Sequence, residues 1–438
     1  MSSTTKPKHS VKVPTQYKVT AKILKAALQK QKSVRTLIFE EKHARTSSLH
    51  GVLRNYSNNI GAINNAIEET GILKDNPRLD PELCKVLVTE LIFGRKQLTG
   101  GGCKPVQTVL EYKERLEKAV SGVEVKKQGQ HPRYVRVNTN LLSVADALDY
   151  LADSEWRKKL LPSDITYPDF LIAIRALEED EFLVDIHVDS MLIFHPKQAC
   201  YWATHDMVRS KKFILQNKAT CLVAELLAPP SGATVLDMCA APGMKTLHIC
   251  NVMQNKGCIY AVELSKDRYK TLLNTNEEGG CSIVKTFNAD ALAMNAEQLP
   301  NVEYILVDPS CSGSGMQSRM DFGENKKDDK RLNKLAGLQI KILSHAMGAF
   351  PDVKRIAYCT CSLWKEENEQ VVQRCLQLNP QFKLLSCKKA LRNRWVNVGS
   401  SDYKGIGNKC LYSQPEHDLT DGIFIALFEK RRDGQGEE

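Results

Sequence analysis

The spacing of hydrophobic residues divides the chain into three parts. In the first part, residues 17–127, apolar side chains recur every three or four positions, as they do along one face of a helix. Ile60, Ile63 and Ile67 follow this spacing, and Gly71 after them is a helix stop signal. We therefore expect an N-terminal helical domain over this part of the chain.

The second part, residues 131–205, begins with a change to strand spacing. Residues 134–138 alternate between apolar and polar side chains, which is typical of a half-buried strand. Ser143 is a helix-cap residue before an amphipathic helix, and residues 182–188 and 191–194 form two further apolar strands. These elements predict a compact α/β subdomain.

In the third part, residues 206–430, short apolar runs alternate with helical stretches. Strands that alternate with crossover helices form a doubly wound, mostly parallel sheet. Such sheets bind their ligands outside the carboxyl ends of the strands. The predicted strands are residues 234–239, 258–264, 283–287, 304–307, 355–361, 382–385 and 423–428. Residues 431–438 are expected to form a flexible tail.

Composition narrows the class of protein. Of 438 residues, 42% are hydrophobic and 26% are charged, which excludes a chain that is disordered throughout. The chain has no apolar run of about 20 residues, and its start lacks the apolar core of a signal peptide. We therefore expect a soluble intracellular protein without membrane contact. Its 14 cysteines are scattered and none has Cys-x-x-Cys spacing, so neither a disulfide framework nor a metal site is expected.

The net charge of +10 is concentrated at one end. Residues 1–50 carry eleven lysines and arginines against two glutamates, a net charge of +9, and the rest of the chain has a net charge of +1. Such a basic segment attracts polyanions such as nucleic acids. A solvated helix face or tail and a nuclear or nucleolar address are two other uses of the same residues, and the sequence leaves all three open.

The first strand of the third part ends in a loop of small residues. From Val235 to Thr246 the chain reads Val-Leu-Asp-Met-Cys-Ala-Ala-Pro-Gly-Met-Lys-Thr. Small side chains let the backbone approach a ligand, and the following helix offers its N-terminal amides. The loop lacks Gly-x-Gly-x-x-Gly, which disfavours a nicotinamide cofactor. Met244 separates the glycine from Lys245-Thr246, so the loop is not a phosphate-binding P-loop either.

Acidic residues follow the next strands. Glu263 comes after the second strand, where a carboxylate can hold both hydroxyls of a ribose, and Arg268 lies one helical turn later. Asp290 follows the third strand, in place to accept a hydrogen bond from an adenine amino group. A helix cap explains any one of these acids alone. Three acids at three consecutive strand ends make capping alone the weaker explanation and favour a nucleoside cofactor without a pyrophosphate, of which S-adenosylmethionine is the common one.

The fourth and fifth strands end in cysteines. Asp308 and Cys311 follow the fourth strand, and Cys359 and Cys361 lie at the end of the fifth. Thiols beside a methyl donor suggest methylation of an unreactive carbon such as C5 of cytosine. A thiolate that adds to C6 makes C5 nucleophilic, and loss of the C5 proton later expels the thiol. A carboxylate such as Asp308 stabilises charge during the addition, and Lys245 lowers a thiol pKa. A buried core cysteine is the usual explanation for one such residue, but the strand-end positions of Cys311 and Cys361 argue against it.

Three motifs together resemble a known family. Cys239-Ala-Ala-Pro-Gly-Met-Lys245, residues 308–315 and Thr360-Cys361-Ser362 are similar to the Sun-domain (Fmu-like) RNA cytosine-5 methyltransferases, most of all to the eukaryotic members that act on large-subunit ribosomal RNA. The likeness spans about residues 182–429. It implies a Rossmann-like methyltransferase sheet of seven strands, the last antiparallel.

The resemblance also implies an activity and its residues. The implied protein is a nuclear, nucleolar monomer that uses S-adenosylmethionine to form 5-methylcytosine in ribosomal RNA of a pre-ribosome, with the subdomain at residues 131–205 helping to hold RNA. The implied catalytic residues are Cys361 as nucleophile, Cys311 in proton removal or release, and Asp308. The implied cofactor-binding residues are Cys239, Ala240, Ala241, Pro242, Gly243, Met244, Lys245, Glu263, Arg268, Asp290 and Asp308.

One departure and several alternatives stand beside this interpretation. Most family members read Asp-Ala-Pro-Cys, whereas here Ser310 separates the proline from Cys311, so the duty of Cys311 is left open. Cys359, where the family usually has serine, is predicted to be incidental. The charged insertion at residues 319–334 is either a cover that touches RNA or a solvated loop. The alternative functions are a non-catalytic RNA-binding ribosome-assembly factor and a DNA cytosine-5 methyltransferase, in which the fourth-strand cysteine is the nucleophile.

Overall fold

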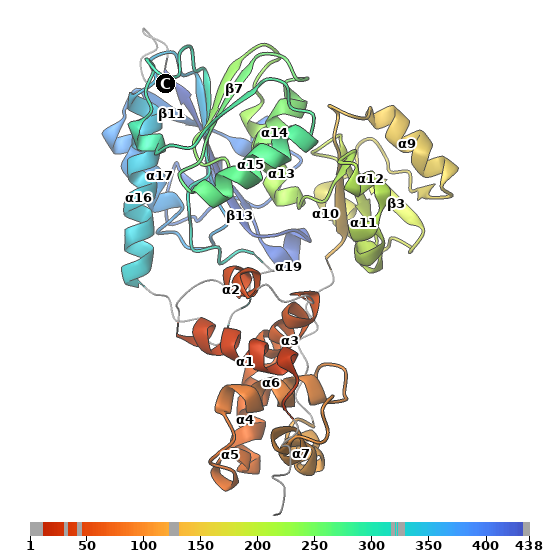
Figure 1. Ribbon diagram of the computed structural model, residues 1–438. Helices are drawn as coiled ribbons and strands as arrows, with labels where there is room; N and C mark the ends of the chain where they lie inside the picture. The colour runs from red at the N-terminus through yellow and green to blue at the C-terminus, as the bar shows by residue number, and fades with distance from the viewer. Residues whose placement is uncertain are drawn as a thin grey trace, which may run out of the picture. The chain divides into compact units, whose positions relative to one another are not determined.

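The computed structural model describes residues 12–29, 34–41, 46–121, 131–316, 320, 322 and 329–431. These residues form two compact units, a helical N-terminal unit and a larger unit that holds two sheets (Figure 1). Within the described residues, no helix is both long enough and apolar enough to cross a membrane.

The described part of the first unit is built from helices alone, as the hydrophobic spacing predicts. The most apolar of them, α6, lies against α1, α3 and α4 and buries side chains on nearly every side. It begins where it does because the Asp80 side chain accepts a hydrogen bond from the Leu83 amide, 2.7 Å away. The helices are α1 (Thr15–Leu28), α2 (Val34–Glu40), α3 (Thr46–Asn58), α4 (Ile60–Thr70), α5 (Ile72–Asp75), α6 (Pro81–Ile92), α7 (Lys104–Glu111) and α8 (Lys113–Ala119).

Two residues of the charged insertion belong to this helical core. Met320 and Phe322 pack against it, and the Phe322 ring stacks on Tyr56 with 5.8 Å between ring centroids. Half of the insertion predicted to be a cover or a solvated loop, residues 319, 321 and 323–328, lies outside the described residues, so that choice stays open there. Its last six residues, 329–334, are helical and begin α16 (Asp329–Gly348).

The second unit begins with a small mixed sheet, which is the predicted α/β subdomain. Its strand order is β2-β3-β4-β1-β5, and β1 pairs antiparallel with both β4 and β5. Its elements are β1 (Arg133–Val137), α9 (Val144–Asp153), β2 (Arg157–Lys158), α10 (Tyr167–Arg175), β3 (Glu181–Val184), β4 (Met191–Phe194), a 3-10 turn (Pro196–Gln198), α11 (Ala199–Thr204), α12 (Asp206–Arg209) and β5 (Phe213–Ile214). The sheet thus includes residues beyond 205, where the sequence pattern ends the subdomain.

The strand predicted at residues 182–188 is shorter than expected. It ends at Val184 because the Asp185 carboxylate accepts hydrogen bonds from the amides of His187 and Val188, at 2.8 and 3.1 Å. An aspartate that bonds the backbone two residues ahead forms a turn, and this overrides the apolar pattern.

The large sheet confirms the predicted doubly wound fold. Its strand order is β11-β13-β10-β9-β6-β7-β8, and a short additional strand, β12, pairs with β13. Strand β13 runs antiparallel to its neighbours, as predicted for the last strand. The elements are α13 (Lys218–Leu227), β6 (Thr234–Asp237), α14 (Met244–Val252), β7 (Cys258–Val262), α15 (Lys266–Glu278), β8 (Val284–Phe287), a 3-10 turn (Ala291–Ala293), β9 (Tyr304–Val307), α16 (Asp329–Gly348), β10 (Arg355–Thr360), α17 (Glu369–Leu378), β11 (Phe382–Leu385), α18 (Cys387–Ala390), a 3-10 turn (Gly407–Lys409), β12 (Leu411–Ser413), α19 (Pro415–Asp418) and β13 (Ile423–Lys430).

Helices cover both faces of this sheet (Figure 1). Alternate residues of each strand face opposite sides, so Leu306 of β9 joins the core under α13 and α14, whereas Ile305 and Val307 join the core under α16 and α17. Because both faces are buried, the strands are apolar throughout, and polar side chains are left to the loops at the strand ends.

A buried ion pair joins the subdomain to the large sheet. The Lys218 ammonium at the start of α13 lies 2.6 Å from the carboxylate of Asp185, which follows β3, and both side chains are buried. The Tyr167 hydroxyl of α10 also donates a hydrogen bond to Asp418 of α19, at 3.0 Å. The two sheets therefore belong to one unit.

Candidate active site

The site lies where five parallel strands of the large sheet end. Strands β8, β7, β6, β9 and β10 are neighbours and run in the same direction. Their carboxyl ends therefore share one edge, and the loops after them lie side by side. Every site residue predicted from the sequence lies on one of these loops or within the first turns of the helix that follows.

The small-residue loop after β6 is held by an arginine. Arg268 of α15 donates a hydrogen bond to the carbonyl oxygen of Ala241, and its guanidinium lies 3.3 Å from the Glu263 carboxylate. The loop turns into α14 at Gly243, whose φ of 100° is a left-handed conformation that favours glycine. The structure thus brings together the predicted cofactor residues of β6, β7 and α15.

The two acids predicted to hold a nucleoside differ in their surroundings. Glu263 is buried and accepts a hydrogen bond from the Ser265 amide at 2.8 Å. Asp290 is exposed, and one of its oxygens accepts a hydrogen bond from the Leu292 amide at 3.0 Å. It therefore caps a 3-10 turn, which is the explanation that the sequence offers for any one of these acids alone. Beside them Leu264 is 69% exposed, an apolar surface at a strand end.

These residues fit S-adenosylmethionine. A buried carboxylate suits the ribose hydroxyls, the exposed Leu264 offers an apolar face to an adenine ring, and the loop of small residues leaves room for the amino-acid part. Asp237 at the end of β6 also fits a bound polar ligand, because it is buried and one of its oxygens has no hydrogen-bond partner among the described residues. Burial raises the pKa of this carboxyl to about 7.

Asp308 is fixed from both sides. Its Oδ2 lies 2.6 Å from the Lys245 ammonium, and its Oδ1 accepts a hydrogen bond from the Cys359 thiol at 3.4 Å. Burial is the largest single influence and lowers the pKa of Lys245, but the charge of Asp308, the nearby thiols of Cys359 and Cys361 and the hydrogen bond to Asp308 together outweigh it and raise that pKa well above its usual value. Cys359, expected to be incidental, therefore contacts the carboxylate of Asp308.

The thiols of Cys311 and Cys361 share a hydrogen bond. The pKa of Cys361 is lowered, first because Cys311 donates this bond to it; burial opposes the shift, and the Lys245 charge supports it. The pKa of Cys311 is raised well above its usual value by the same bond, by burial and by nearby negative charge. The shared bond thus shifts the pKa of Cys361 down and that of Cys311 up, so Cys361 is the more readily ionised of the two thiols.

A buried glutamate ties the two cysteine loops together. Glu367 accepts hydrogen bonds from the Ser312 amide at 2.8 Å and from the Ser362 hydroxyl at 2.5 Å. These donors stand next to Cys311 and Cys361 respectively, so one carboxylate sets the spacing of both thiols. A third bond comes from Gln339 of α16 at 3.0 Å. The same Gln339 amide donates to the carbonyl of Ser310 at 3.1 Å, so α16 holds the residue that departs from the family pattern.

Sequence reasoning missed Glu367. It lies six residues beyond Cys361 in the run Glu366-Glu367-Asn368-Glu369, which reads as a solvated charged stretch. Yet Glu367, Asn368 and Glu369 are all buried, and Asn368 accepts a hydrogen bond from Thr360 at 2.5 Å. The only signal in the sequence is that this acidic run precedes α17 directly after a catalytic loop.

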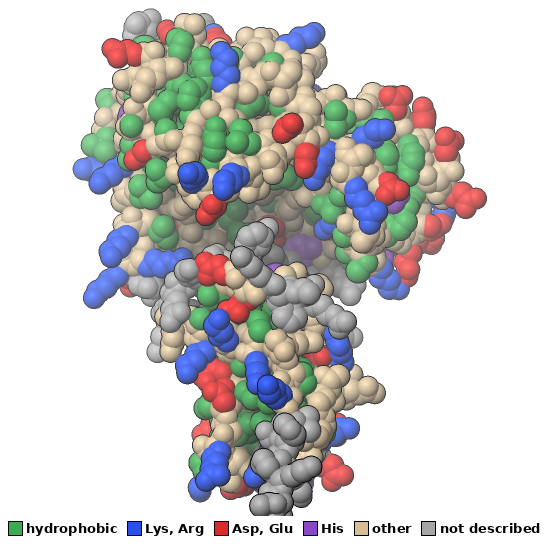
Figure 2. All heavy atoms as spheres, viewed as in Figure 1, with side chains coloured by type: hydrophobic (Ala, Val, Ile, Leu, Met, Phe, Trp, Pro, Cys, Tyr) green, Lys and Arg blue, Asp and Glu red, His purple; other side chains and the backbone are tan. Residues whose placement is uncertain are grey.

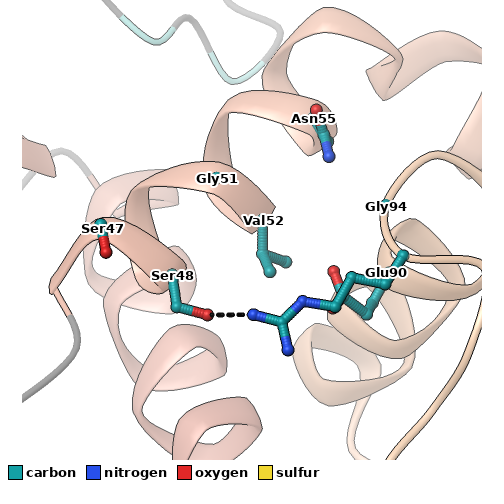
Figure 3. Close-up of a pocket in the computed structure, with 8 residues that line it drawn as sticks. Ser47, Ser48, Gly51, Val52, Asn55, Glu90 and Gly94 are labelled. Carbon is teal, nitrogen blue, oxygen red and sulfur yellow. Dashed lines mark hydrogen bonds and ion pairs between the residues drawn. The ribbon is translucent and has the colours of Figure 1, made fainter. Parts of the chain in front are cut away.

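A cavity also exists in the helical unit, but it lacks reactive groups. It measures about 420 Å³ and lies between α3 and the end of α6 (Figure 3). Arg95 reaches across it to donate a hydrogen bond to Ser48 at 3.1 Å and lies 3.4 Å from the Glu90 carboxylate. Its lining residues are Ser47, Ser48, Gly51, Val52, Asn55, Glu90, Gly94 and Arg95. With no thiol and its carboxylate paired, the cavity offers none of the chemistry found at the sheet edge.

Comparisons with known proteins follow the same division of the chain. Residues 224–429 match the family model of the 16S rRNA methyltransferases RsmB/F. Residues 131–216 match the ferredoxin-like domain, and residues 54–134 the N-terminal domain, of NOL1/NOP2/Sun domain family member 5.

Relatives match over almost the whole chain. A 28S rRNA (cytosine-C(5))-methyltransferase of Drosophila melanogaster is 67% identical and covers 98% of this chain and 99% of its own. One from Mus musculus is 33% identical, over 94% of this chain and 90% of its own.

Two solved structures share the fold. One, titled PH0851, has a TM-score of 0.64 at 21% identity, over 96% of this chain and 100% of its own. A methyltransferase homologue from Pyrococcus horikoshii has a TM-score of 0.52 at 21% identity, over 84% of this chain and 99% of its own.

Proposed function

The chain belongs to the Sun-domain family of RNA cytosine-C5 methyltransferases, and from this premise we propose that it forms 5-methylcytosine in large-subunit ribosomal RNA. The observation that carries the proposal is the pair of thiols at the ends of β9 and β10, of which Cys361 has a lowered pKa. A low-pKa thiol beside a fixed carboxylate is what addition to a pyrimidine ring requires.

The reaction begins with Cys361. Its thiolate adds to C6 of the cytosine, and the electron pair of the C5–C6 double bond moves into the ring toward N3. Asp308, held by Lys245 and Cys359, lies at this edge to stabilise the charge that develops at N3 and the exocyclic amine. C5 becomes nucleophilic and takes the methyl group.

Cys311 completes the reaction. The largest cause of its raised pKa is its hydrogen bond to Cys361, and this cause disappears once Cys361 is bonded to C6. The Cys311 thiol then ionises more readily and, as a thiolate, takes the proton from C5. The C5–H electrons restore the C5–C6 double bond, the C6–S bond breaks, and Cys361 leaves as a thiolate.

The cofactor site of the proposal is the edge formed by β6, β7 and β8. S-adenosylmethionine supplies, when bound, a methyl group on a sulfonium. Glu263 would hold its ribose, Asp290 its adenine amino group, and residues 239–245 its amino-acid part. Arg268 keeps the loop closed through its bonds to Ala241 and Glu263.

The substrate part of the proposal follows from the relatives. Their names specify ribosomal RNA, so we infer a monomeric enzyme that acts on pre-ribosomal RNA in the nucleus and nucleolus. The C5 atom of a stacked base is out of reach, so the target cytosine must be single-stranded or flipped out of its helix.

The assignment of the nucleophile is tested by trapping. Cys361→Ala is expected to abolish methyl transfer and to abolish the covalent adduct with RNA that contains 5-azacytosine, both measured on purified protein. Cys311→Ala is the matched control, and it should retain the adduct and accumulate it. A trapped adduct on Cys311, as in DNA cytosine-5 methyltransferases, would contradict the proposal. Isothermal titration without S-adenosylmethionine binding would favour the non-catalytic assembly factor instead.

A further inference from the structure

Residues 386–410, between β11 and β12, are unusually basic. They contain six lysines and arginines and one acid, Asp402, a net charge of +5 in 25 residues. The sequence pattern did not single this segment out, and the methyl chemistry does not use it. We call it the basic bridge.

The basic bridge starts at the active-site edge of the sheet. Strand β11 pairs antiparallel with β13, and β13 pairs antiparallel with β10, so β11 and β10 point the same way. The bridge therefore leaves β11 at the edge where Cys361 leaves β10. Two strand spacings, about 10 Å, separate the two strands, and β11 ends with Leu385 at the level of Ala357, four residues before Cys361.

Contacts hold the basic bridge to the loop that carries the nucleophile. The Ser400 amide donates a hydrogen bond to Glu369 at 2.7 Å, and Asp402 pairs with Lys365 at 3.6 Å. Since Lys365 and Glu369 follow Cys361 within eight residues, the bridge is a fixed neighbour of the catalytic loop. Its one acid is also neutralised by this pair.

The other side of the basic bridge rests on the subdomain. The Trp395 ring is buried with its centroid 4.8 Å from that of Tyr167, and Arg394 donates a hydrogen bond to the Ser163 carbonyl at 3.2 Å. The bridge thus spans from the subdomain to the catalytic loop with a defined backbone.

Three cations of the basic bridge point to solvent. Lys388, Lys389 and Arg392 are exposed, and none pairs with a carboxylate of the described residues. Beyond them, Val396 and Val398 are 50% and 37% exposed, while Trp395, which directly precedes Val396, is buried. The surface therefore combines unpaired positive charge with aliphatic side chains.

The subdomain itself has the opposite charge. Residues 131–216 contain ten lysines and arginines against thirteen acids. Figure 2 shows acidic side chains along its outer margin, over α9 and the loop before β3. Exposed acids there are Asp146, Asp149, Asp153, Glu155, Glu178, Glu179 and Asp180. Glu178 and Asp180 pair with Arg157, and Glu179 pairs with Lys197, so the four acids at α9 are the ones that disfavour a phosphate backbone here. A polyanion is therefore drawn to the basic bridge rather than to this margin.

We propose that the basic bridge binds the phosphate backbone of the single-stranded RNA that flanks the target cytosine. The inference rests on the proposed function, because it names the surface that holds the substrate of that site. Lys388, Lys389 and Arg392 contact phosphates, and Val396 and Val398 pack against a neighbouring base. Contacts to phosphates fix the register of a strand without reading its sequence, which is what a flanking surface must do.

The test reverses the three free charges. The variant Lys388→Glu/Lys389→Glu/Arg392→Glu is compared with Lys256→Glu/Lys285→Glu/Lys341→Glu, which changes three exposed lysines outside the strand-end loops and the bridge. Binding of a short fluorescein-labelled single-stranded RNA is measured by polarisation over a series of salt concentrations. Three lost phosphate contacts reduce the slope of log affinity against log salt by about 2, and weaken binding roughly ten-fold near physiological salt. The control variant should keep both values.

Catalysis gives a second, separable readout. In the bridge variant the KM for ribosomal RNA should rise roughly ten-fold with kcat and S-adenosylmethionine affinity unchanged. Equal RNA affinity and salt slope in the bridge variant and the wild type would overturn the inference. Loss of polyglutamate binding with RNA binding intact would assign the surface to an acidic protein and overturn it too. If wild-type protein binds RNA but transfers no methyl group, the proposed function fails while the binding test still decides this inference.

Discussion

A single hydrogen bond makes the thiols of Cys311 and Cys361 different. Cys311 donates to Cys361, so the bond stabilises the ionised form of Cys361 and the protonated form of Cys311. In the proposed reaction this difference gives the two cysteines two roles, Cys361 as the nucleophile and Cys311 as the base. The hydrogen bond from Cys311 lowers the pKa of Cys361, and the positive charge of Lys245 lowers it further.

This coupling predicts a shift in pH dependence. A thiolate is present above the pKa of its thiol, so a lowered pKa keeps Cys361 reactive at lower pH. Cys311→Ala removes the donor, and the rising limb of the Cys361 alkylation rate should move to higher pH. The measurement is iodoacetamide labelling of the Cys361 peptide by mass spectrometry across a pH series. Cys84, whose pKa burial raises to about 12, is an internal slow reference. If the Cys361 alkylation rate rises at the same pH in Cys311→Ala and in the wild type, the hydrogen bond between the two thiols does not lower the pKa of Cys361.

Glu367 is a positioning residue, and its variants should separate catalysis from binding. Glu367→Gln loses one acceptor of the three bonds that it receives. The cysteine loops then shift, and a misplacement of about 1 Å costs roughly a hundred-fold in rate. We expect kcat to fall to that extent, with the KM for RNA and S-adenosylmethionine affinity near wild type.

The matched control for Glu367 is its neighbour Glu369. It is equally buried but accepts from Ser400 in the basic bridge rather than from a cysteine loop. Glu369→Gln should lower the stability of the protein. Its kcat and the pH dependence of its Cys361 alkylation rate should stay as in the wild type. If both variants lose kcat equally, Glu367 only supports the fold.

At the scale of elements, the junction between β6 and α14 is set by close packing. A Cβ at Gly243 would lie 3.1 Å from both Leu272 and Thr275 of α15, and φ there is 100°. The glycine therefore allows α14 to begin next to α15, which brings Lys245 to Asp308. The cofactor loop depends on this helix contact as much as on its own residues.

Gly243→Ala should damage stability and cofactor binding together. A side chain in the left-handed region costs about 1–2 kcal/mol, and the contact with α15 adds to it. Urea unfolding and titration with S-adenosylmethionine measure the two effects. Gly337→Ala in α16 is the control, because nothing lies within 4 Å of its Cβ position and a helical alanine stabilises by about 1 kcal/mol. Wild-type stability and cofactor affinity in Gly243→Ala would contradict the packing argument.

At the scale of the whole molecule, the Lys218–Asp185 pair couples two sheets. Burial lowers the pKa of Lys218, and Asp185 works against this shift. The rings of Tyr167, Phe170 and Trp395 surround the ammonium at 5.5, 4.9 and 5.9 Å from their centroids. The charge is therefore stabilised by one carboxylate and by aromatic faces, and its loss leaves Asp185 buried without a cation.

Breaking this pair should destabilise the larger unit selectively. Lys218→Met is expected to cost about 3–5 kcal/mol in unfolding free energy, and Lys218→Met/Asp185→Asn should recover part of it. All four tryptophans, Trp156, Trp202, Trp364 and Trp395, lie in the larger unit, so urea unfolding followed by tryptophan fluorescence reports on that unit alone. Equal midpoints for wild type and Lys218→Met would show that the pair adds nothing.

Patterns local to the chain were predictable in this protein. Strands β9, β4 and β11 lie where the apolar runs place them, because both faces of a buried strand exclude polar residues. Glu263, Asp290, Asp308 and Cys361 follow β7, β8, β9 and β10, and their common edge was predictable because parallel strands end on the same side of a sheet. Strands β2 and β5, of two residues each, carry too short a pattern to be recognised.

The sequence by itself determined the N-terminal helices, the α/β elements that follow and the doubly wound sheet. Only the tertiary structure decided that Glu367 joins the two cysteine loops, that Cys359 contacts Asp308, and that residues 386–410 contact the segment after Cys361. The reason is the range of the interactions. Periodicity and caps act over a few residues, whereas Ser312 and Glu367 are 55 residues apart and meet only because β9 and β10 pair.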